Sequence, residues 1–497
     1  MKILLITTPK EGECVEGTTP AYLLYDFSNY PPLGLLALAA NVDPRHDLQV
    51  LDTVTKNMST ADTVEHIKKV KPDLLGLSVA SRRLYPMKAV TGKIKEELPD
   101  TTIIVGGAHP NEFGMETIGL GTMDYVMSGY CELAFPKFVE VLDKIRNGNR
   151  NTEGLLAEVP GLFYRIDGKI KVNPEDEKAQ SLDHLPYPKR DLVDLNDYFT
   201  AADKEKMTTM YTSRGCPYKC TFCDVTEKRY HYRSTEKIVD EMEHITSLGI
   251  KEIHIFDDTF NLNRKRVIDM CNEIIRRGLK VRWTARVRAN PLDREMLILM
   301  KKAGASRLHA GIESLDPAAL EAMRKQITLD HIKDFFALCR ELRINTLCYM
   351  ILGFPEESKH YRDIFFKTLM TLKPTYVFIN VLYPLAKTQL YSELVANGFY
   401  EKDYWAEFFR NPVPCFELPP MRTPELQKEV VELMDSVHKK FYLSPSFIMQ
   451  DIRRNMNPKM LMRKAKMAMR LIFANTLQEN AADAHHSAPY SSNVTSH

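Results

Sequence analysis

The chain has 497 residues, of which 44% are hydrophobic and 27% are charged, with 22 glycines and 28 prolines. This composition is typical of a globular protein of roughly three domains, and it excludes a collagen-like, fully disordered or low-complexity chain. Lysine and arginine number 67 against 65 aspartate and glutamate, so no global charge predicts binding to nucleic acid. No run of about 20 apolar residues predicts a membrane span.

The first 145 residues alternate short apolar runs with amphipathic helical patterns. Runs at 3–8, 74–79 and 103–105 have the length of buried strands, and helical patterns lie between them. Strands separated by helices predict βαβ units and a doubly wound, Rossmann-like α/β domain over residues 1–145. Glycines follow the strands at Gly106-Gly107 and Gly129, where open α/β sheets bind ligands. We expect a nucleotide-sized cofactor at this edge.

A second series of strands and helices starts near Met210, after a segment of different character. Residues 146–205 are rich in turn signals, including a hairpin pattern over 162–172, and predict a linker. The later series has apolar runs at 253–256, 281–284, 307–310, 346–352 and 376–380. Six strands in this order predict a full or partial (β/α)6 barrel over 206–395, with active residues at the carboxyl ends of its strands.

The C-terminal part has a mainly helical pattern over 396–474, with helices expected at 424–442 and 447–473. The second of these is rich in Met, Arg and Lys. We interpret it as a solvated basic face over a Met-packed face, and contact with a membrane surface or a hydrophobic substrate is the alternative. The composition of residues 475–497 predicts a disordered tail.

Nine cysteines, an odd number spread along the chain, argue against a disulfide framework and for reduced thiols. The apolar start of the chain lacks the features of a signal peptide, so we expect a cytoplasmic protein. Three thiols form one tight cluster, Cys216, Cys220 and Cys223, after the first strand of the second series. Three ligands leave one position of an inorganic centre open, whereas His231 would complete a Cys3His zinc site.

This segment resembles the radical S-adenosylmethionine (SAM) superfamily, in which a Cys-x3-Cys-x2-Cys loop follows the first barrel strand. The resemblance runs from about residue 209 to residue 384. It implies that Cys216, Cys220 and Cys223 are the catalytic ligands of a 4Fe–4S cluster whose fourth iron binds SAM. Reduction of the cluster would then cleave SAM to a 5'-deoxyadenosyl radical. Phe222 is expected to pack beside the cluster and the adenine.

The same resemblance implies further SAM contacts at the ends of later strands. Asp257 and Asp258 are expected near the SAM ammonium group, and Arg286 near the SAM carboxylate or a cofactor phosphate. Glu313 is expected to accept hydrogen bonds from the ribose hydroxyls. Gly353 is expected to let the adenine approach closely, because it has no side chain.

The N-terminal half resembles the cobalamin-binding domain that is joined to many radical SAM enzymes, through the stretches 30–35, 72–78 and 105–110. The resemblance implies cobalamin contacts from residues at strand ends, namely Ser78, Gly106, Gly107, His109 and Gly129. The Asp-x-His-x-x-Gly motif that supplies an axial histidine in many corrinoid modules is absent from residues 52–57. We therefore expect cobalamin without a histidine from that motif, and we expect His109 to cap a turn or touch the corrin tail.

Together the two resemblances predict a class B radical SAM enzyme, specifically a cobalamin-dependent methyltransferase acting on an unactivated carbon or phosphinate centre. Cyclization or rearrangement without net methyl transfer, and a non-catalytic corrinoid or cluster sensor, are the alternatives. Expected partners are a small-molecule substrate and an electron donor such as flavodoxin or ferredoxin, with no nucleic acid. Aromatic residues of the C-terminal part would suit a large apolar substrate such as a lipid, porphyrin or natural-product intermediate, but they are also typical of a core: Tyr400, Tyr404, Trp405, Phe408, Phe409 and Phe416.

Overall fold

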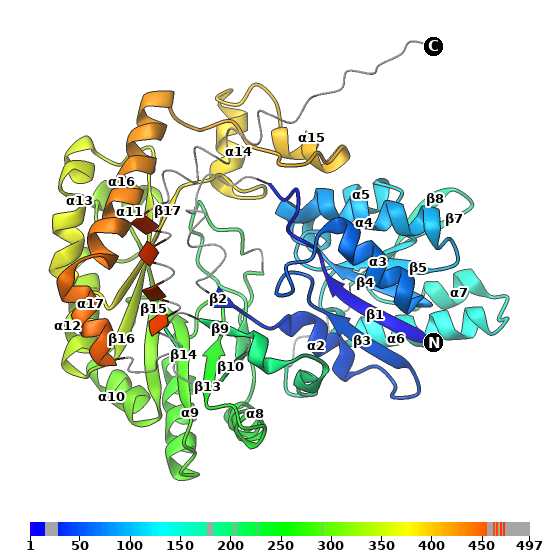
Figure 1. The fold of residues 1–497 in the computed structure, drawn as a ribbon, viewed down its shortest axis with the longest axis horizontal. Coiled ribbons are helices and arrows are strands. Elements are labelled where there is room, and N and C mark those ends of the chain that lie inside the picture. The colour runs from blue at the N-terminus through cyan, green and yellow to red at the C-terminus, as the bar shows by residue number, and fades with distance from the viewer. Residues whose placement is uncertain are drawn as a thin grey trace.

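The chain forms two α/β units that lie side by side (Figure 1). The computed structural model describes residues 1–14, 28–175, 182–200, 202–203, 206–225, 227–290 and 292–454, with the pairs 461–462, 464–465, 468–469 and 471–472. The expected disordered tail, 475–497, lies outside the described residues, as does much of the expected basic helix beyond residue 454. In this described part, no helix is long and apolar enough to cross a bilayer.

The first unit is built on a seven-stranded sheet in the order β3-β1-β4-β5-β6-β7-β8. Its strands are β1 (Lys2–Thr7), β3 (Asp47–Leu51), β4 (Leu74–Ser78), β5 (Thr102–Gly106), β6 (Tyr125–Met127), β7 (Leu162–Ile166) and β8 (Lys169–Val172). The first five strands in the order are parallel to one another. The strand order reverses between β1 and β4, which is the switch point of a doubly wound sheet. The predicted Rossmann-like sheet is confirmed.

Helices cover both faces of this sheet because successive residues of its strands are apolar. Leu4 and Ile6 of β1 join one buried cluster, and Ile3 and Leu5 join the other. The connecting helices are α2 (Leu33–Ala40), α3 (Thr60–Val70), α4 (Leu84–Glu97), α5 (Pro110–Gly119), α6 (Cys131–Arg146) and α7 (Thr152–Leu156). The sheet is thus buried on both sides, and ligands can reach it only at its edges.

The hairpin predicted over 162–172 forms, but it belongs to the first sheet and not to a linker. Strand β7 pairs antiparallel with β6, and the Ser128 N–H donates to the Gly161 carbonyl at 3.0 Å. Without this pairing, the backbone groups along β6 would lie unsatisfied at a sheet edge. The first unit therefore extends into the segment 146–205, and the other domain boundaries stay predictions.

The second unit contains a six-stranded parallel sheet in the sequential order β10-β13-β14-β15-β16-β17. Its strands are β10 (Met207–Met210), β13 (Glu252–Ile255), β14 (Arg282–Val287), β15 (Ala305–Glu313), β16 (Asn345–Leu352) and β17 (Tyr376–Val381). These are the six predicted strands, and their order is that of a partial (β/α)6 barrel. The predicted fold class is confirmed.

Helices follow the barrel strands, and side-chain caps fix where they begin. They are α8 (Thr235–Ser247), α9 (Arg264–Arg276), α10 (Arg294–Lys302), α11 (Pro317–Ala322), α12 (Leu329–Glu341) and α13 (Lys359–Leu372). Asn263, Asp293, Thr328 and Ser358 each accept a hydrogen bond from the N–H three residues later, which satisfies a free donor of the helix start.

The two faces of the barrel sheet differ in polarity. Leu308 and Ala310 of β15 join the large apolar cluster beneath the helices. Arg307 and His309 alternate with them and therefore point to the inner face. The inner face is thus available for polar chemistry.

The C-terminal segment returns from the second unit to the first, and Figure 1 shows α15 lying over the first unit, near α5. Its helices are α14 (Gln389–Ala396), α15 (Tyr404–Arg410), α16 (Pro424–Tyr442) and α17 (Pro445–Arg454). Helix α16 packs on β17, whereas the aromatic residues of α15 join the apolar cluster of the first unit. Trp405 is only 2% exposed. The aromatic set expected to suit a large substrate is therefore largely core.

We predict that the stability of the chain falls as the pH is lowered from 7 to 5, partly through His438. This side chain of α16 is buried and accepts a hydrogen bond from the Ile379 N–H at 3.2 Å. Burial lowers its pKa to about 4, although a hydrogen bond with the Met434 backbone opposes the shift. The unfolded chain therefore binds a proton near pH 6.5 that the native chain does not bind, which costs about 2 kcal/mol at pH 5.

Denaturant unfolding of the wild type and of His438→Gln at both pH values measures this effect. The pH dependence of the unfolding free energy should shrink by that amount in the variant. An unchanged pH dependence would contradict the prediction.

Candidate active site

The three clustered cysteines lie on one closed loop, residues 215–230, which we call the cysteine loop. Two short strands, β11 (Ser213–Arg214) and β12 (His231–Tyr232), pair antiparallel and close its base. Gly215 has a φ of 83°, and a Cβ there would lie 1.9 Å from the Arg229 carbonyl oxygen. Only glycine allows the two ends of the loop to approach this closely.

A buried carboxylate, Asp257, fixes the residues that lead into the cysteine loop. Its Oδ1 accepts hydrogen bonds from the Thr212 and Ser213 N–H groups at 2.7 and 2.9 Å. Its Oδ2 accepts the hydroxyl protons of the same two residues, and the Arg266 guanidinium lies 3.4 Å away. Asp257 was expected near the SAM ammonium, but the chain itself already occupies both of its oxygens.

The three thiols are free of disulfide bonds and differ in their surroundings. Cys216 Sγ lies 3.3 Å from Thr259 Oγ1, and Arg288 Nη1 lies 3.9 Å from Cys220 Sγ. Burial raises the pKa of the Cys223 thiol to about 11. This thiol is therefore protonated at neutral pH, and binding a metal ion there must release the proton.

The three sulfurs do not lie at the mutual distances of a single-ion site. Among the described residues, the one triad whose ligand atoms come within 4.8 Å of one another is Asp203, Glu252 and His254, so the three cysteines are more widely spaced. A zinc ion with bonds of about 2.3 Å would bring its sulfurs to about 3.8 Å. This spacing counts against the Cys3His zinc site.

Other side chains at the same edge keep polar atoms available. Asp258 Oδ2 accepts the Gly215 N–H at 2.8 Å, and Oδ1 has no hydrogen-bond partner in the described part. Partial burial raises the pKa of Asp258. Arg286 stacks 4.3 Å from the Phe256 ring centroid and makes no ion pair with any described residue. Asp258 and Arg286 can therefore bind a charged ligand.

Glu313 and Phe222 are held by neighbours from the same edge. Glu313 ends β15 with a φ of 67°, and one of its oxygens pairs with Lys325 Nζ at 2.8 Å. Phe222 packs on an apolar cluster that includes Met323 and Phe354, and Lys325 Nζ lies 5.9 Å from its ring centroid. The second Glu313 oxygen remains able to accept hydroxyl donors.

The structure fills the space beside Gly353 with another part of the chain. A Cβ at Gly353 would lie 2.6 Å from Arg422 Nε, and the Arg422 guanidinium donates to the Gly353 carbonyl at 2.8 and 2.6 Å. Because Gly353 has no side chain, the Arg422 guanidinium can pack against it. The sequence had predicted that the adenine of SAM approaches at this place.

The residues expected to contact cobalamin lie at the carboxyl ends of β4, β5 and β6. Ser78 and Gly106 end neighbouring strands beside the switch point. A Cβ on Gly107 would lie 2.8 Å from the Val79 carbonyl oxygen, and one on Gly129 would lie 2.8 Å from the Glu175 carboxyl carbon. Close packing of the chain explains these two glycines.

His109 is part of the core and not of an open edge. Its Nδ1 lies 2.9 Å from Ser81 Oγ, and its ring packs against Phe113 and Phe409. It is 1% exposed, and burial lowers its pKa to about 3. The ring is therefore neutral and enclosed by aromatic residues, which disfavours contact with a cofactor.

An ion pair between the two units brings the cysteine loop to the first sheet. Arg214, just before the loop, pairs with Glu132, which follows β6. Burial alone would raise the pKa of Glu132, but the Arg214 guanidinium keeps it below its usual value. Nearby, the Tyr130 hydroxyl donates to Glu227 at 3.4 Å. We did not predict this contact. Its only signal in the sequence is that a charged residue lies next to each motif, Arg214 before the cysteine loop and Glu132 shortly after Gly129.

Comparison with known proteins agrees with this arrangement. The Radical SAM superfamily model matches residues 210–369, and the B12 binding domain model matches residues 25–139. An uncharacterized methyltransferase of Pyrococcus horikoshii is 30% identical over 461 residues, which cover 91% of this chain and 95% of that protein. The chain belongs to the cobalamin-binding radical SAM proteins. A 4Fe–4S cluster, SAM and cobalamin are the cofactors of such an enzyme.

Two further relatives show the range of this family. The anaerobic magnesium-protoporphyrin IX monomethyl ester cyclase of Rubrivivax gelatinosus is 24% identical, covering 84% of this chain and 75% of that protein. The solved structure of the cobalamin-dependent SAM radical enzyme OxsB, with aqua-cobalamin and SAM bound, has a TM-score of 0.63 at 17% identity. It covers 96% of this chain and 72% of its own, and it supports the fold.

We predict that Asp257→Asn destabilises this radical SAM protein by about 2–4 kcal/mol, because an amide cannot accept all the hydrogen bonds that the carboxylate accepts. Asp258→Asn is the matched control, since that side chain accepts a single hydrogen bond and is exposed. Denaturant unfolding monitored by circular dichroism measures both. Equal effects of the two substitutions would contradict the assigned role of Asp257.

Proposed function

We propose that the chain transfers a methyl group to an unactivated carbon or phosphinate centre, with cobalamin as the methyl carrier. The observation that carries the proposal is the Arg214–Glu132 ion pair, which holds the loop after β6 against the cysteine loop. A methyl donor and a substrate radical must meet within contact distance, so both cofactors have to share one space between the units. The methyltransferase from Pyrococcus horikoshii supports this function.

In this proposal, Cys216, Cys220 and Cys223 bind three irons of the 4Fe–4S cluster. The three thiols are free of disulfide bonds, and Gly215 closes them into a small loop, which fits such a group. When bound, the cluster supplies the electron that cleaves SAM to methionine and a 5'-deoxyadenosyl radical, and cobalamin carries the methyl group. The apolar cluster around Phe222 excludes water from this side of the loop.

The SAM contacts that we propose are the groups whose atoms remain available. Asp258 Oδ1 would face the SAM ammonium, and the Arg286 guanidinium would bind its carboxylate. The free oxygen of Glu313 would accept hydrogen bonds from the ribose, while Lys325 holds the other oxygen in place. Asp257 is not among these contacts, because Thr212 and Ser213 already donate to both of its oxygens. Gly353 is not among them either, because the Arg422 side chain fills the space beside it.

For cobalamin, we propose the edge at Ser78 and Gly106, together with the loop that begins at Gly129. The axial histidine of many corrinoid modules would stand at the position of Val54, and Asp52 holds this turn by accepting the Val54 N–H and the Tyr198 hydroxyl. The lower face of cobalt would then receive no histidine from this turn.

A cyclization or rearrangement without net methyl transfer is the second candidate function, and the relative that is a cyclase favours it. The substrate would then be a large apolar small molecule, such as a porphyrin. A non-catalytic sensor would bind the same cofactors without turnover. We further propose an electron donor of the flavodoxin or ferredoxin type and a reducing, cytoplasmic location, because reduced thiols and clusters need one.

We predict that Cys220→Ala abolishes cluster assembly and SAM cleavage but leaves cobalamin bound. The cysteine loop is held by Asp257 and by the β11–β12 pair, and neither depends on this thiol. Iron content and retained corrinoid absorbance after anaerobic reconstitution measure the two sites on one sample. Simultaneous loss of corrinoid binding would contradict independent sites.

The experiment that tests the function uses protein purified without oxygen, reconstituted with iron and sulfide, and incubated with hydroxocobalamin. Iron, cobalt and zinc are counted, and products are analysed after incubation with SAM, a strong reductant and candidate apolar substrates. S-adenosylhomocysteine with a methylated product supports methyl transfer, and 5'-deoxyadenosine without S-adenosylhomocysteine supports the cyclization. No cleavage of SAM would favour the sensor, and stoichiometric zinc would overturn all three.

A further inference from the structure

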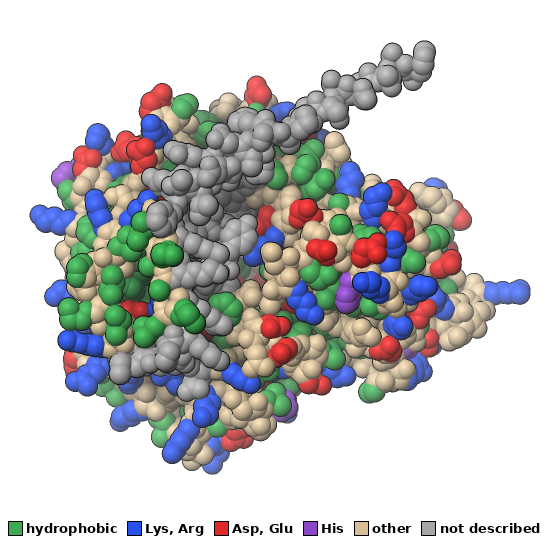
Figure 2. Space-filling model, in the orientation of Figure 1, with side chains coloured by type: hydrophobic (Ala, Val, Ile, Leu, Met, Phe, Trp, Pro, Cys, Tyr) green, Lys and Arg blue, Asp and Glu red, His purple; other side chains and the backbone are tan. Residues whose placement is uncertain are grey.

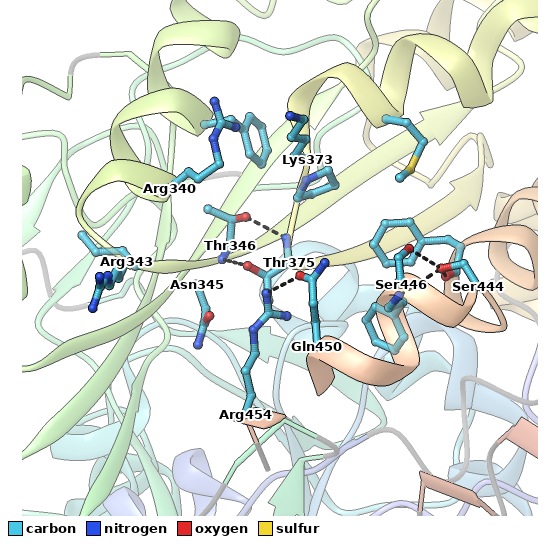
Figure 3. Close-up of a pocket in the computed structure, with 16 residues that line it drawn as sticks. Arg340, Arg343, Asn345, Thr346, Lys373, Thr375, Ser444, Ser446, Gln450 and Arg454 are labelled. Carbon is cyan, nitrogen blue, oxygen red and sulfur yellow. Dashed lines mark hydrogen bonds between the residues drawn. The ribbon is translucent and has the colours of Figure 1, made fainter. Parts of the chain in front are cut away.

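We propose a second binding site, for a phosphate-bearing anion, at the opposite edge of the barrel from the cysteine loop. A cavity of about 470 Å³ lies where β16 and β17 begin and where α17 crosses them (Figure 3). Strand β16 runs from Asn345 at this cavity to Leu352 at the catalytic edge, and β17 is parallel to it. The cavity is therefore separate from the site of SAM and cobalamin.

The lining of this cavity is strongly basic. Its described side chains include Arg340, Arg343, Lys373 and Arg454, and no aspartate or glutamate is among them. None of the four cations forms an ion pair with a described residue, since Glu341, the acidic neighbour in sequence, pairs with Arg294. In a chain with a net charge of only +2, four unpaired cations around one cavity are a local excess.

Several hydrogen-bond donors in the cavity have no acceptor among the described residues. Arg340 uses one N–H, to the Leu372 carbonyl at 3.4 Å, and Arg454 uses one, to Gln450 Oε1 at 3.0 Å. The Asn345 amide has no partner among the described residues, and Figure 3 shows it beside the start of β16. Guanidinium groups bind phosphate oxygens through paired, charge-assisted hydrogen bonds, so a phosphate group satisfies this donor set.

Helix ends alone do not explain the grouping. Arg340, Lys373 and Arg454 lie at the ends of α12, α13 and α17, where the helix dipole stabilises a cation. This accounts for each residue by itself, but it does not account for their convergence on a cavity without a counter-ion. The cavity volume is in the range of small-molecule sites, which favours a small anion over the flat surface of an acidic protein.

The phosphate group has two possible sources, a free metabolite or a lipid headgroup. Next to the cavity, α17 exposes Ile448, Met449 and Ile452 by 43%, 52% and 44%. Figure 2 shows hydrophobic side chains on the face of the molecule where α16 and α17 lie. An apolar ridge beside a basic pocket suits an anionic membrane surface, whereas the pocket alone suits a soluble anion.

We would test the site with the full chain and two probes, pyrophosphate by isothermal titration calorimetry and phosphatidylcholine vesicles with or without phosphatidylglycerol by co-sedimentation. The double variant Arg340→Gln/Arg343→Gln should bind the probe about tenfold more weakly or worse. Lys265→Gln/Arg276→Gln removes the same charge from the exposed surface of α9 and is the matched control. Arg340→Lys/Arg343→Lys keeps the charge but loses the paired donors, so its binding should lie between those of the wild type and the Gln variant.

Pyrophosphate binding that depends on Arg340 and Arg343 supports a soluble anion. Binding only to vesicles with phosphatidylglycerol, with the same dependence, supports a lipid headgroup. Lack of binding to both probes, or equal weakening in the control variant, overturns the site. Lys373→Gln gives an independent reading if the double variant unfolds. Because the pocket lies away from the cysteine loop, SAM cleavage should be unchanged in all these variants, so failure here leaves the proposed enzymatic function intact.

Discussion

The geometry of the active site depends on one buried carboxylate. Asp257 follows β13 and binds the backbone and hydroxyl groups of Thr212 and Ser213, which follow β10. A buried charge is destabilising unless hydrogen bonds satisfy it. Movement of the start of the cysteine loop would break these bonds and leave the Asp257 carboxylate unsatisfied, so the loop start is fixed. Arg214 follows Ser213 directly in the chain. Its backbone is therefore held in place where its side chain pairs with Glu132. The contact between the units therefore depends on the hydrogen bonds that Asp257 accepts within the second unit.

The C-terminal segment adds a second constraint on the two units. Trp405 and Phe409 pack in the core of the first unit, although β17 before this segment and α16 after it belong to the second. The Cys415 N–H also donates to the Gly12 carbonyl at 3.1 Å. The C-terminal segment leaves the barrel and completes the core of the first unit. It thus joins the two units at a second place, besides the Arg214–Glu132 ion pair. The space between them is consequently set by packing as well as by charge.

Much of the fold could be predicted because its signals are local. Buried strands and amphipathic helices repeat along the chain, so the six barrel strands follow from periodicity alone. The misjudged features depend on distant residues: Gly353 meets Arg422, 69 residues later, and the hairpin at 162–172 joins a sheet whose edge is visible only in three dimensions. Asp257 and Asp258 are adjacent and chemically identical, yet one is buried in a network and the other is exposed, which no sequence pattern distinguishes.

The barrel interior is polar at its amino end, where Asp203, His254 and Arg307 form a buried network. Asp203 contacts His254 and Arg307, each at 3.1 Å, and Arg307 donates to His309 at 2.9 Å. Burial alone would raise the pKa of Asp203, but His254 and Arg307 hold it below its usual value, so the carboxylate stays charged. Arg307 thus supplies the positive charge that a metal ion would otherwise bring to Asp203, Glu252 and His254. These buried groups fill the amino end of the barrel, whereas Asp258, Arg286 and Glu313 lie at the carboxyl ends of its strands, on the same edge as the cysteine loop.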